Sequence, residues 1–208
     1  MEQRPHQLRT IDVGDSPAAW ESAGFSLTDG AVTIGSTRIN LTPGDERGIR
    51  SVGVDGVDAP IDSMPFGPIG RHELGSSSHP NHVVAIDHLV AMSGDVDRTI
   101  TALHTADIEL RRERHLGEGD DAKRQAFFWL GDVILELAGP AVPRENGAGS
   151  LWGLALTCAD LDAAKDHLGD RLSDPKSAVQ PGRRIATLRT RELDISIPLA
   201  LMSPHRPG

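Results

Sequence analysis

Three segments of this chain open short helices in the same way, with an acidic residue ahead of an apolar helical face. They start at Gly14, Gly94 and Ala159. The first two are followed by hairpin-like segments of shared pattern, at residues 31–44 and 127–140. A unit that recurs along a chain is one supersecondary motif used several times. The repetition therefore predicts a fold assembled from copies of a small unit.

The unit is clearest in the second half of the chain. An apolar strand from Val84 leads to a helix whose first backbone N–H groups Asp95 is placed to cap. A more exposed strand at 108–115 and a hairpin within 125–139 complete a βαβββ order. The same order recurs over residues 151–202. Two copies therefore fill the second half.

Residues 1–57 read as a degenerate N-terminal copy followed by a remnant strand of a fourth. Asp15 and Pro17 are expected to begin its helix, with strands to follow at 25–29, 31–35 and 37–41. Residues 58–83 are rich in proline, glycine and serine and predict a surface linker. We therefore expect a two-module domain over residues 84–208.

Composition restricts the classes of function. The 208 residues are 38% hydrophobic, which is typical of a folded globular chain. A net charge of −9, with no Tyr, three Trp and four Phe, disfavours nucleic acid as a partner. The single cysteine, Cys158, is expected to be buried and rules out an intrachain disulfide. Without a recognisable signal peptide or membrane span, we expect a cytoplasmic protein with no membrane partner.

Four motifs in this order resemble a known family. They are IDHLV at Ile86, the helix entry with Asp95 and Asp97, FWLGDVILEL from Phe128, and the DLD entry at Asp160. With this set the chain resembles the glyoxalase-like group of the vicinal oxygen chelate superfamily. The resemblance implies an α+β fold in which repeated βαβββ modules form a curved mixed sheet around a cleft for a small organic molecule.

Two classes of function follow from the resemblance, and the sequence leaves the choice open. The first is an enzyme, namely a lyase, an isomerase or a ring-cleaving dioxygenase. The second is a non-catalytic protein that binds or sequesters a small molecule without a metal. The sequence contains none of the motifs of nucleotide-dependent or serine-hydrolase chemistry.

The resemblance also implies a divalent metal, Fe, Mn, Ni or Zn, held by inward-facing His and Glu side chains of first and last strands. His88 and Glu136 stand at these positions. The two-residue period of a strand places Glu136 on one face with Ile134 and Ala138, toward the presumed cleft. Imidazole and carboxylate ligands leave positions open for two substrate oxygens.

Comparison of the copies leaves this ligand set incomplete. Aligning the helix caps places Gly153 and either Ser196 or Pro198 at the matching positions of the next module, and Leu8 and Asn40 at those of the first. Two ligands are fewer than a metal site normally has. Completion would need one of the remaining candidates, Asp194, His82, His79 or a residue of a second chain.

Glu136 would also function without a metal. Burial in an apolar cleft raises the pKa of a carboxylate toward neutrality, which suits a general base that removes a proton next to a carbonyl. His88 would then orient or polarise that carbonyl. The alternative roles are structural: a hydrogen-bonded histidine inside the sheet and a carboxylate paired with an arginine.

The candidate substrate-binding residues are Arg183 and Arg184, which stand beside a Pro–Gly turn, together with Trp129 and Phe128. An arginine at a cleft mouth binds carboxylate or phosphate through two parallel hydrogen bonds, although a solvated turn is the interpretation that we favour for this segment. Trp129 alternates with Phe128, so one of the two rings must face the cleft.

Other charged segments are expected to be structural. The arginines of the exposed strand, Arg111, Arg112 and Arg114, are interpreted as surface charges balanced by Glu109 and Glu113. HPNH, at residues 79–82, is interpreted as a structural cap. The unpaired N-terminal copy leaves a sheet edge that the linker or a second subunit would cover, and we expect a homodimer.

Overall fold

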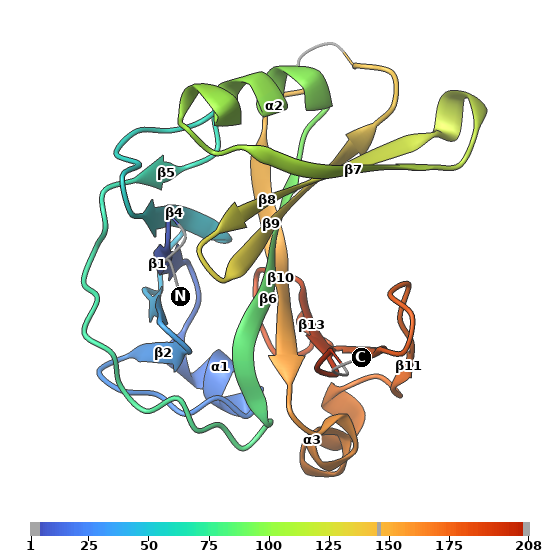
Figure 1. The fold of residues 1–208 in the computed structure, drawn as a ribbon. Coiled ribbons are helices and arrows are strands. Elements are labelled where there is room, and N and C mark those ends of the chain that lie inside the picture. The colour runs from blue at the N-terminus through green and yellow to red at the C-terminus, as the bar shows by residue number, and fades with distance from the viewer. Residues whose placement is uncertain (1–4, 145–146, 206–208) are drawn as a thin grey trace.

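The computed structural model describes residues 5–144 and 147–205, which form two mixed β-sheets flanked by short helices (Figure 1). One sheet has eight strands in the order β11-β12-β13-β10-β6-β9-β8-β7, and the other has five in the order β2-β3-β1-β4-β5. Buried apolar side chains of both sheets belong to one continuous core. The predicted α+β fold of repeated modules is confirmed.

Two βαβββ modules build the eight-stranded sheet. The first consists of β6 (Val83–Met92), α2 (Val96–Thr105), β7 (Leu110–Leu116), the 3-10 turn η1 (Gly119–Asp121), β8 (Lys123–Leu130) and β9 (Val133–Pro140). The second consists of β10 (Ser150–Cys158), α3 (Leu161–Leu168), η2 (Gly169–Arg171), β11 (Lys176–Ser177), β12 (Arg184–Thr187) and β13 (Leu199–Met202). β6 and β10 pair antiparallel at the centre, and each pairs in parallel with the last strand of its own module.

The predicted caps begin both helices of this domain. The Asp95 carboxylate accepts the backbone N–H of Arg98 at 3.0 Å, and Asp160 caps α3 in the same way. Gly169, at φ +58°, ends α3, as a residue without a Cβ can do at little cost. Local sequence therefore sets the ends of these helices.

The N-terminal sheet is a shortened copy of the same arrangement. It contains β1 (Leu8–Val13), β2 (Ala31–Ile34), β3 (Thr37–Leu41), β4 (Ile49–Val54) and β5 (Phe66–Gly67), with α1 (Pro17–Ser22) after β1. β1 and β4 pair antiparallel, as β6 and β10 do in the larger sheet. β1 also pairs parallel with β3, as β6 does with β9. β4 pairs parallel with β5, as β10 does with β13. Two copies of the paired-module plan therefore stand in one chain.

Two expectations for this half are wrong. The strand expected at 25–29 is reduced to an isolated bridge between Thr28 and Ala31. The segment 58–83 is not only a connection, because β5 lies in it and supplies the last strand of the shortened fourth copy. Since β5 covers the edge of β4, the argument from an open edge to a second subunit no longer holds, and the homodimer stays a prediction.

The rest of the linker lies over one face of the N-terminal sheet and runs along the outside of the molecule in Figure 1. Thr10 and Thr33 accept the backbone N–H groups of Gly70 and Gly75. Asn40 donates to the carbonyl of Arg71 at 3.3 Å. The face of this sheet that matches the cleft of the larger one is therefore occupied by the chain itself.

His79 anchors the end of this segment. Its Nδ1 accepts the backbone N–H of Ser26 at 3.1 Å, and its Nε2 lies 2.9 Å from the carbonyl oxygen of Thr33, to which it donates. Burial lowers the pKa of His79. The ring is thus a neutral structural link, as the sequence predicted for HPNH, and is not available to complete a metal site.

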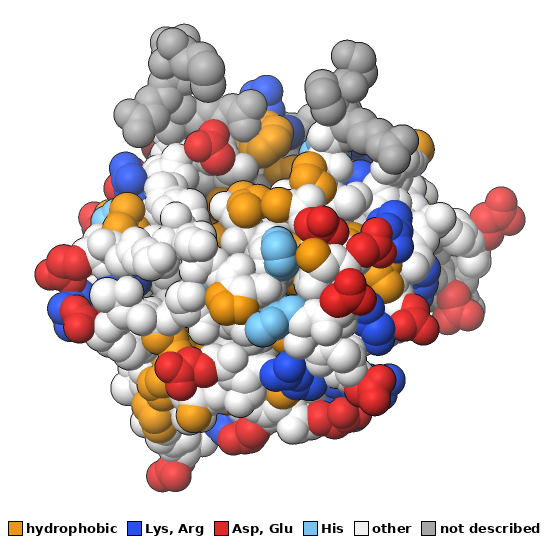
Figure 2. All heavy atoms as spheres, turned by 90° about the horizontal axis from the view of Figure 1, so that it is seen from below, with side chains coloured by type: hydrophobic (Ala, Val, Ile, Leu, Met, Phe, Trp, Pro, Cys, Tyr) orange, Lys and Arg blue, Asp and Glu red, His pale blue; other side chains and the backbone are white. Residues whose placement is uncertain are grey.

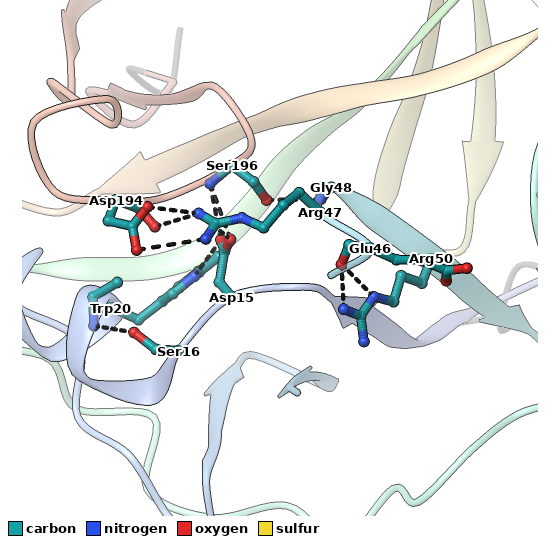
Figure 3. A network of polar contacts seen from close by, with 10 residues as sticks. Asp15, Ser16, Trp20, Glu46, Arg47, Gly48, Arg50, Asp194 and Ser196 are labelled. Carbon is teal, nitrogen blue, oxygen red and sulfur yellow. Dashed lines mark hydrogen bonds and ion pairs between the residues drawn. The ribbon is translucent and has the colours of Figure 1, made fainter. Parts of the chain in front are cut away.

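Asp15 joins the two halves of the chain (Figure 3). Its fully buried carboxylate accepts the indole N–H of Trp20 at 3.1 Å and the backbone N–H of Ser196 at 3.0 Å, and lies 3.2 Å from Arg47. The helix cap expected of Asp15 is provided instead by Ser16, whose hydroxyl accepts from the first turn of α1. The acidic residue at this helix entry therefore holds a loop of the other half.

Two features of the composition can be checked on the structure. Cys158 is buried and has a pKa raised to about 11 by burial, in agreement with its expected place in the core. Within the described ranges no helix is long and apolar enough to cross a membrane. Seen from below the view of Figure 1, the surface mixes acidic and basic side chains (Figure 2).

Candidate functional site

A cavity of about 500 Å³ opens on the face of the eight-stranded sheet. Strands β6, β8 and β9 contribute the side chains of His88, Gln125, Phe127, Trp129, Ile134 and Glu136 to its lining. Side chains of β10, β12 and β13 line the opposite side with Ala155, Ile185 and Met202. The predicted cleft therefore exists, and both predicted polar residues line it.

The strand period places Glu136 in this cavity as expected. Ile134 and Glu136 line the cavity, whereas Val133, Leu135 and Leu137 are buried in the core. The amide Nε2 of Gln125, on the neighbouring strand, donates to Glu136 Oε1 at 2.6 Å. A half-buried amide of the sheet thus fixes the carboxyl group.

The environment of Glu136 raises the pKa of its carboxyl group above the usual value. Burial raises the pKa of Glu136, while the charges of His88 and Arg114 and the hydrogen bond from Gln125 lower it, and the net direction is upward. A carboxyl group held in this way gives up its proton less readily than one in water. It is therefore a stronger base when it is ionised.

A bulge in β6 brings a second carboxylate to His88. The cross-strand partner shifts from Ala155, opposite His88, to Leu156, opposite Ile86, which leaves Asp87 as the extra residue. His88 Nδ1 lies 2.6 Å from Asp87 Oδ2. Because a carboxylate only accepts, Nδ1 carries the hydrogen, and Nε2 is the nitrogen left for the cavity.

Asp87 is itself held by Arg183. The guanidinium donates to both carboxylate oxygens, at 2.8 and 3.1 Å, and its side chain is 1% exposed. Burial acts to raise the pKa of Asp87, but the hydrogen bonds from His88 and Arg183 outweigh it and hold the pKa below its usual range. Arg183 thus contacts Asp87, and Asp87 contacts His88, which lines the cavity. Both contacts are buried and charge-assisted.

Among the comparisons with known proteins, the one with solved structures identifies the fold. No protein-family model and no curated protein sequence matches the chain. Among solved structures, a triple mutant of 4-hydroxymandelate synthase from Streptomyces coelicolor matches with a TM-score of 0.62 and 13% identity, over 98% of this chain and 94% of that one. The chain has the vicinal oxygen chelate fold.

Two other solved structures are similar to this chain over different shares of its length. A fusion protein of a xylose isomerase-like TIM barrel and 4-hydroxyphenylpyruvate dioxygenase matches 99% of this chain and 50% of its own, with 10% identity and a TM-score of 0.63. Methylmalonyl-CoA epimerase from Mycobacterium tuberculosis matches 60% of this chain and 91% of its own, with 20% identity and a TM-score of 0.47. At these identities the likeness concerns the fold and not the chemistry.

The donor set of this vicinal oxygen chelate cavity does not fit a resident metal ion. His88, Glu136 and His205 are the cavity side chains able to bind a metal, but Nε2 of His205 accepts an N–H of Arg183 at 3.1 Å. Two ligands therefore remain where a protein site normally supplies three or four. Gln125 Oε1 is buried and without a hydrogen-bond partner in the described ranges, but its atom is enclosed and is not presented to the cavity. No group of three His, Cys, Asp or Glu side chains among the described residues is arranged to hold a metal.

The candidates for completing the ligand set lie elsewhere. Asp194 pairs with Arg47 at 3.0 Å, and the Ser196 hydroxyl accepts the backbone N–H of Gly48 at 2.8 Å (Figure 3). His82 is exposed and outside the cavity lining. A metal, Fe, Mn, Ni or Zn, stays a prediction, which elemental analysis of protein purified without an affinity tag tests directly.

The predicted substrate-binding residues divide into two groups. Trp129 and Phe128 both border the cavity, with Trp129 on the cleft face and Phe128 1% exposed in the core. Arg183 lies behind the cavity on Asp87, and Arg184 forks onto the exposed carboxylate of Asp162 at 2.8 and 2.9 Å. Neither arginine lines the cavity.

The arginines of β7 do line it, in contrast to their expected role. Arg111, Arg112 and Arg114 all belong to the cavity wall. The glutamates that were expected to balance them are engaged elsewhere, since Glu113 pairs with Arg124 and Glu109 with His104. The expected exposure of this strand is confirmed, but the expected balance of its arginines by Glu109 and Glu113 is wrong.

Sequence reasoning missed Asp87 and Gln125. The period of two that separates Phe127 and Trp129 from the core also places Gln125 on the cleft face, and this signal was available. The same period assigns Asp87 to the face opposite His88. Only the bulge places Asp87 beside His88, and a bulge leaves no clear mark in this sequence.

Proposed function

We propose that this protein binds a small carbonyl compound in the cavity and transfers a proton at the carbon beside the carbonyl, as an isomerase or lyase of the vicinal oxygen chelate fold does in principle. The observation that carries the proposal is a largely buried carboxylate of raised pKa in the same cavity as a buried imidazole. Such a pair supplies one base and one acid.

Glu136 is the base in this proposal. Its carboxylate takes the proton from carbon, and the electron pair of the broken C–H bond forms the double bond of an enolate. The charge that develops on the carbonyl oxygen is met by Nε2–H of His88. Return of a proton to the opposite face of the same carbon completes an isomerisation, with no oxidant or reductant consumed.

Asp87 determines what His88 can do. Nδ1–H of His88 donates to Asp87. In the neutral ring, Nε2 can therefore only accept a hydrogen bond, and it donates one only when the ring is an imidazolium. The Asp87 carboxylate fixes the orientation of the ring through Nδ1–H, and Arg183 keeps that carboxylate ionised. Arg183 and Asp87 are therefore positioning residues and do not meet the substrate.

Hydrogen–deuterium exchange tests this proposal. In D2O, the protein is expected to catalyse exchange at the carbon beside the carbonyl in a panel of 2-oxo acids and ketones followed by proton NMR. Glu136→Gln should abolish the exchange and leave ligand binding measurable. The matched control is Glu113→Gln, which removes a carboxylate paired with Arg124 outside the cavity lining. Full exchange in Glu136→Gln would end the proposal.

The second candidate is a protein that binds a small molecule without converting it. The apolar rings and side chains of Phe127, Trp129, Ile134 and Met202 favour it, because they bury a ligand without reacting with it. A ligand that binds and is recovered unchanged, without isotope exchange, would support this function over catalysis.

A further inference from the structure

The strand β7 carries an unusual concentration of positive charge in an acidic protein. The chain has a net charge of −9, yet Arg111, Arg112 and Arg114 stand within four residues on one wall of the cavity. A bulge between Leu110 and Arg112 makes Arg111 the extra residue of the pairing with β8. Two consecutive arginines can therefore border the same cavity.

These three guanidinium groups have no acceptor in the described part of the chain. Most other arginines there bind a carboxylate or a backbone carbonyl; Arg9, Arg98 and Arg184 each pair with an aspartate. Arg112 stands 5.7 Å from the centre of the Phe127 ring, which is a contact between a cation and an aromatic face. Their hydrogen-bond donors thus remain free for a ligand.

The register of β7 against β8 directs this charge toward the reacting groups. Arg112 is opposite Phe127, and Arg114 is opposite Gln125, whose amide holds Glu136. Glu113 lies between them in the sequence and pairs with Arg124 outside the cavity lining. The cavity therefore has an apolar interior, one carboxyl group and a cationic wall.

From this arrangement we infer that the ligand of the cavity is an organic anion, whose carboxylate or phosphate binds Arg111 and Arg114 while its apolar part lies against Phe127 and Trp129. The inference rests on the proposed function for the placement of the reacting carbon near Glu136. A guanidinium fork matches the planar oxygens of both anions through two parallel hydrogen bonds.

Binding of such an anion would also strengthen the base. The charge of Arg114 lowers the pKa of Glu136, and a bound anion offsets that charge. The pKa of Glu136 then rises further when the site is filled. The carboxylate that remains ionised becomes a better acceptor for the substrate proton.

A pair of dyes of similar shape tests the inference. 1-Anilinonaphthalene-8-sulfonate is an anion, and N-phenyl-1-naphthylamine is its uncharged counterpart. The wild-type protein should bind the anionic dye at least about tenfold more tightly, a difference that each of Arg111→Met and Arg114→Met reduces and 0.5 M NaCl weakens. Arg114→Lys, which keeps the charge and loses the fork, should fall between.

The matched control is Arg191→Met, which removes a guanidinium on an exposed turn away from the cavity and should leave both dyes unaffected. Displacement of the anionic dye by hexanoate but not by hexylphosphonate would assign a carboxylate ligand, and the reverse a phosphate. Equal affinity for the two dyes, or equal losses in Arg191→Met and Arg114→Met, would overturn the inference.

Its failure can be distinguished from failure of the proposed function. If the anion preference is real and Glu136 is not the base, Glu136→Gln retains isotope exchange while the preference for the anionic dye persists. If Glu136 is the base and the arginines are not an anion site, Glu136→Gln loses exchange and the arginine variants bind both dyes as the wild type does.

Discussion

The contact between Arg183 and Asp87 should contribute more to stability than any other ion pair of comparable geometry in the described chain. The Arg183 side chain is 1% exposed and that of Asp87 9% exposed, and two hydrogen bonds join them. Removing Arg183 leaves the buried carboxylate of Asp87 without its guanidinium partner, although hydrogen bonds from His88 and Thr157 remain. Arg183→Met should therefore lower the free energy of unfolding by about 3–5 kcal/mol.

A double-mutant cycle isolates the pair. Asp87→Asn combined with Arg183→Met should be less destabilising than the sum of the single changes, with a coupling energy of about 1–3 kcal/mol. The assay is urea unfolding followed by tryptophan fluorescence. Arg184→Met is the control at the next residue, because its equally well-formed fork to Asp162 lies in solvent and should matter little.

The pH dependence of the cycle has a definite sign. The pKa of Asp87 is lower in the folded chain than in the unfolded one, so this group stabilises the fold above its unfolded pKa of about 4. That contribution is lost as the pH falls toward the folded value. The loss should be absent from Asp87→Asn. A coupling energy near zero, or equal effects of Arg183→Met and Arg184→Met, would refute the reasoning.

Three other substitutions have defined outcomes. Asp15→Ala leaves an indole N–H and a backbone N–H buried without an acceptor, and should cost about 2–6 kcal/mol in urea unfolding; a cost near zero would contradict this role. Gly131→Ala should lower the unfolding midpoint, because Gly131 has φ +64° and a Cβ there would clash with the Gln7 side chain. An unchanged midpoint would count against this reasoning. Gln125→Leu removes a hydrogen bond that stabilises the ionised form of Glu136, so carbon NMR should find this carboxyl titrating at higher pH, whereas an unshifted titration would disprove the contact.

The sequence predicts the elements of this fold well because their signals are local. Asp95 and Asp160 cap their helices through contacts within three residues, and the period of two places Glu136 on the cleft face. The fourth copy was harder to find. Its last strand, at Phe66, has two residues and becomes a strand only by pairing with β4.

The candidate site was predicted less completely, because its contacts are long-range. Arg183 meets Asp87 from 96 residues away, and nothing near either residue in the sequence specifies the other. Asp15 looked like a helix cap because it stands one residue before Ser16, the true cap, and its partner is 181 residues along the chain. The acidic residues at the three helix entries thus have different roles, because tertiary contacts engage Asp15 while Asp95 and Asp160 cap their helices.

The linker that lies across the N-terminal sheet has a consequence for valency. A chain with two paired-module sheets has the framework for two ligand sites, and here Asn40 and Thr33 hold the chain's own backbone where the larger sheet presents its cavity. A binding titration should therefore reach its end at one ligand per polypeptide. The linker thus occupies the N-terminal sheet at the place where a second ligand would bind.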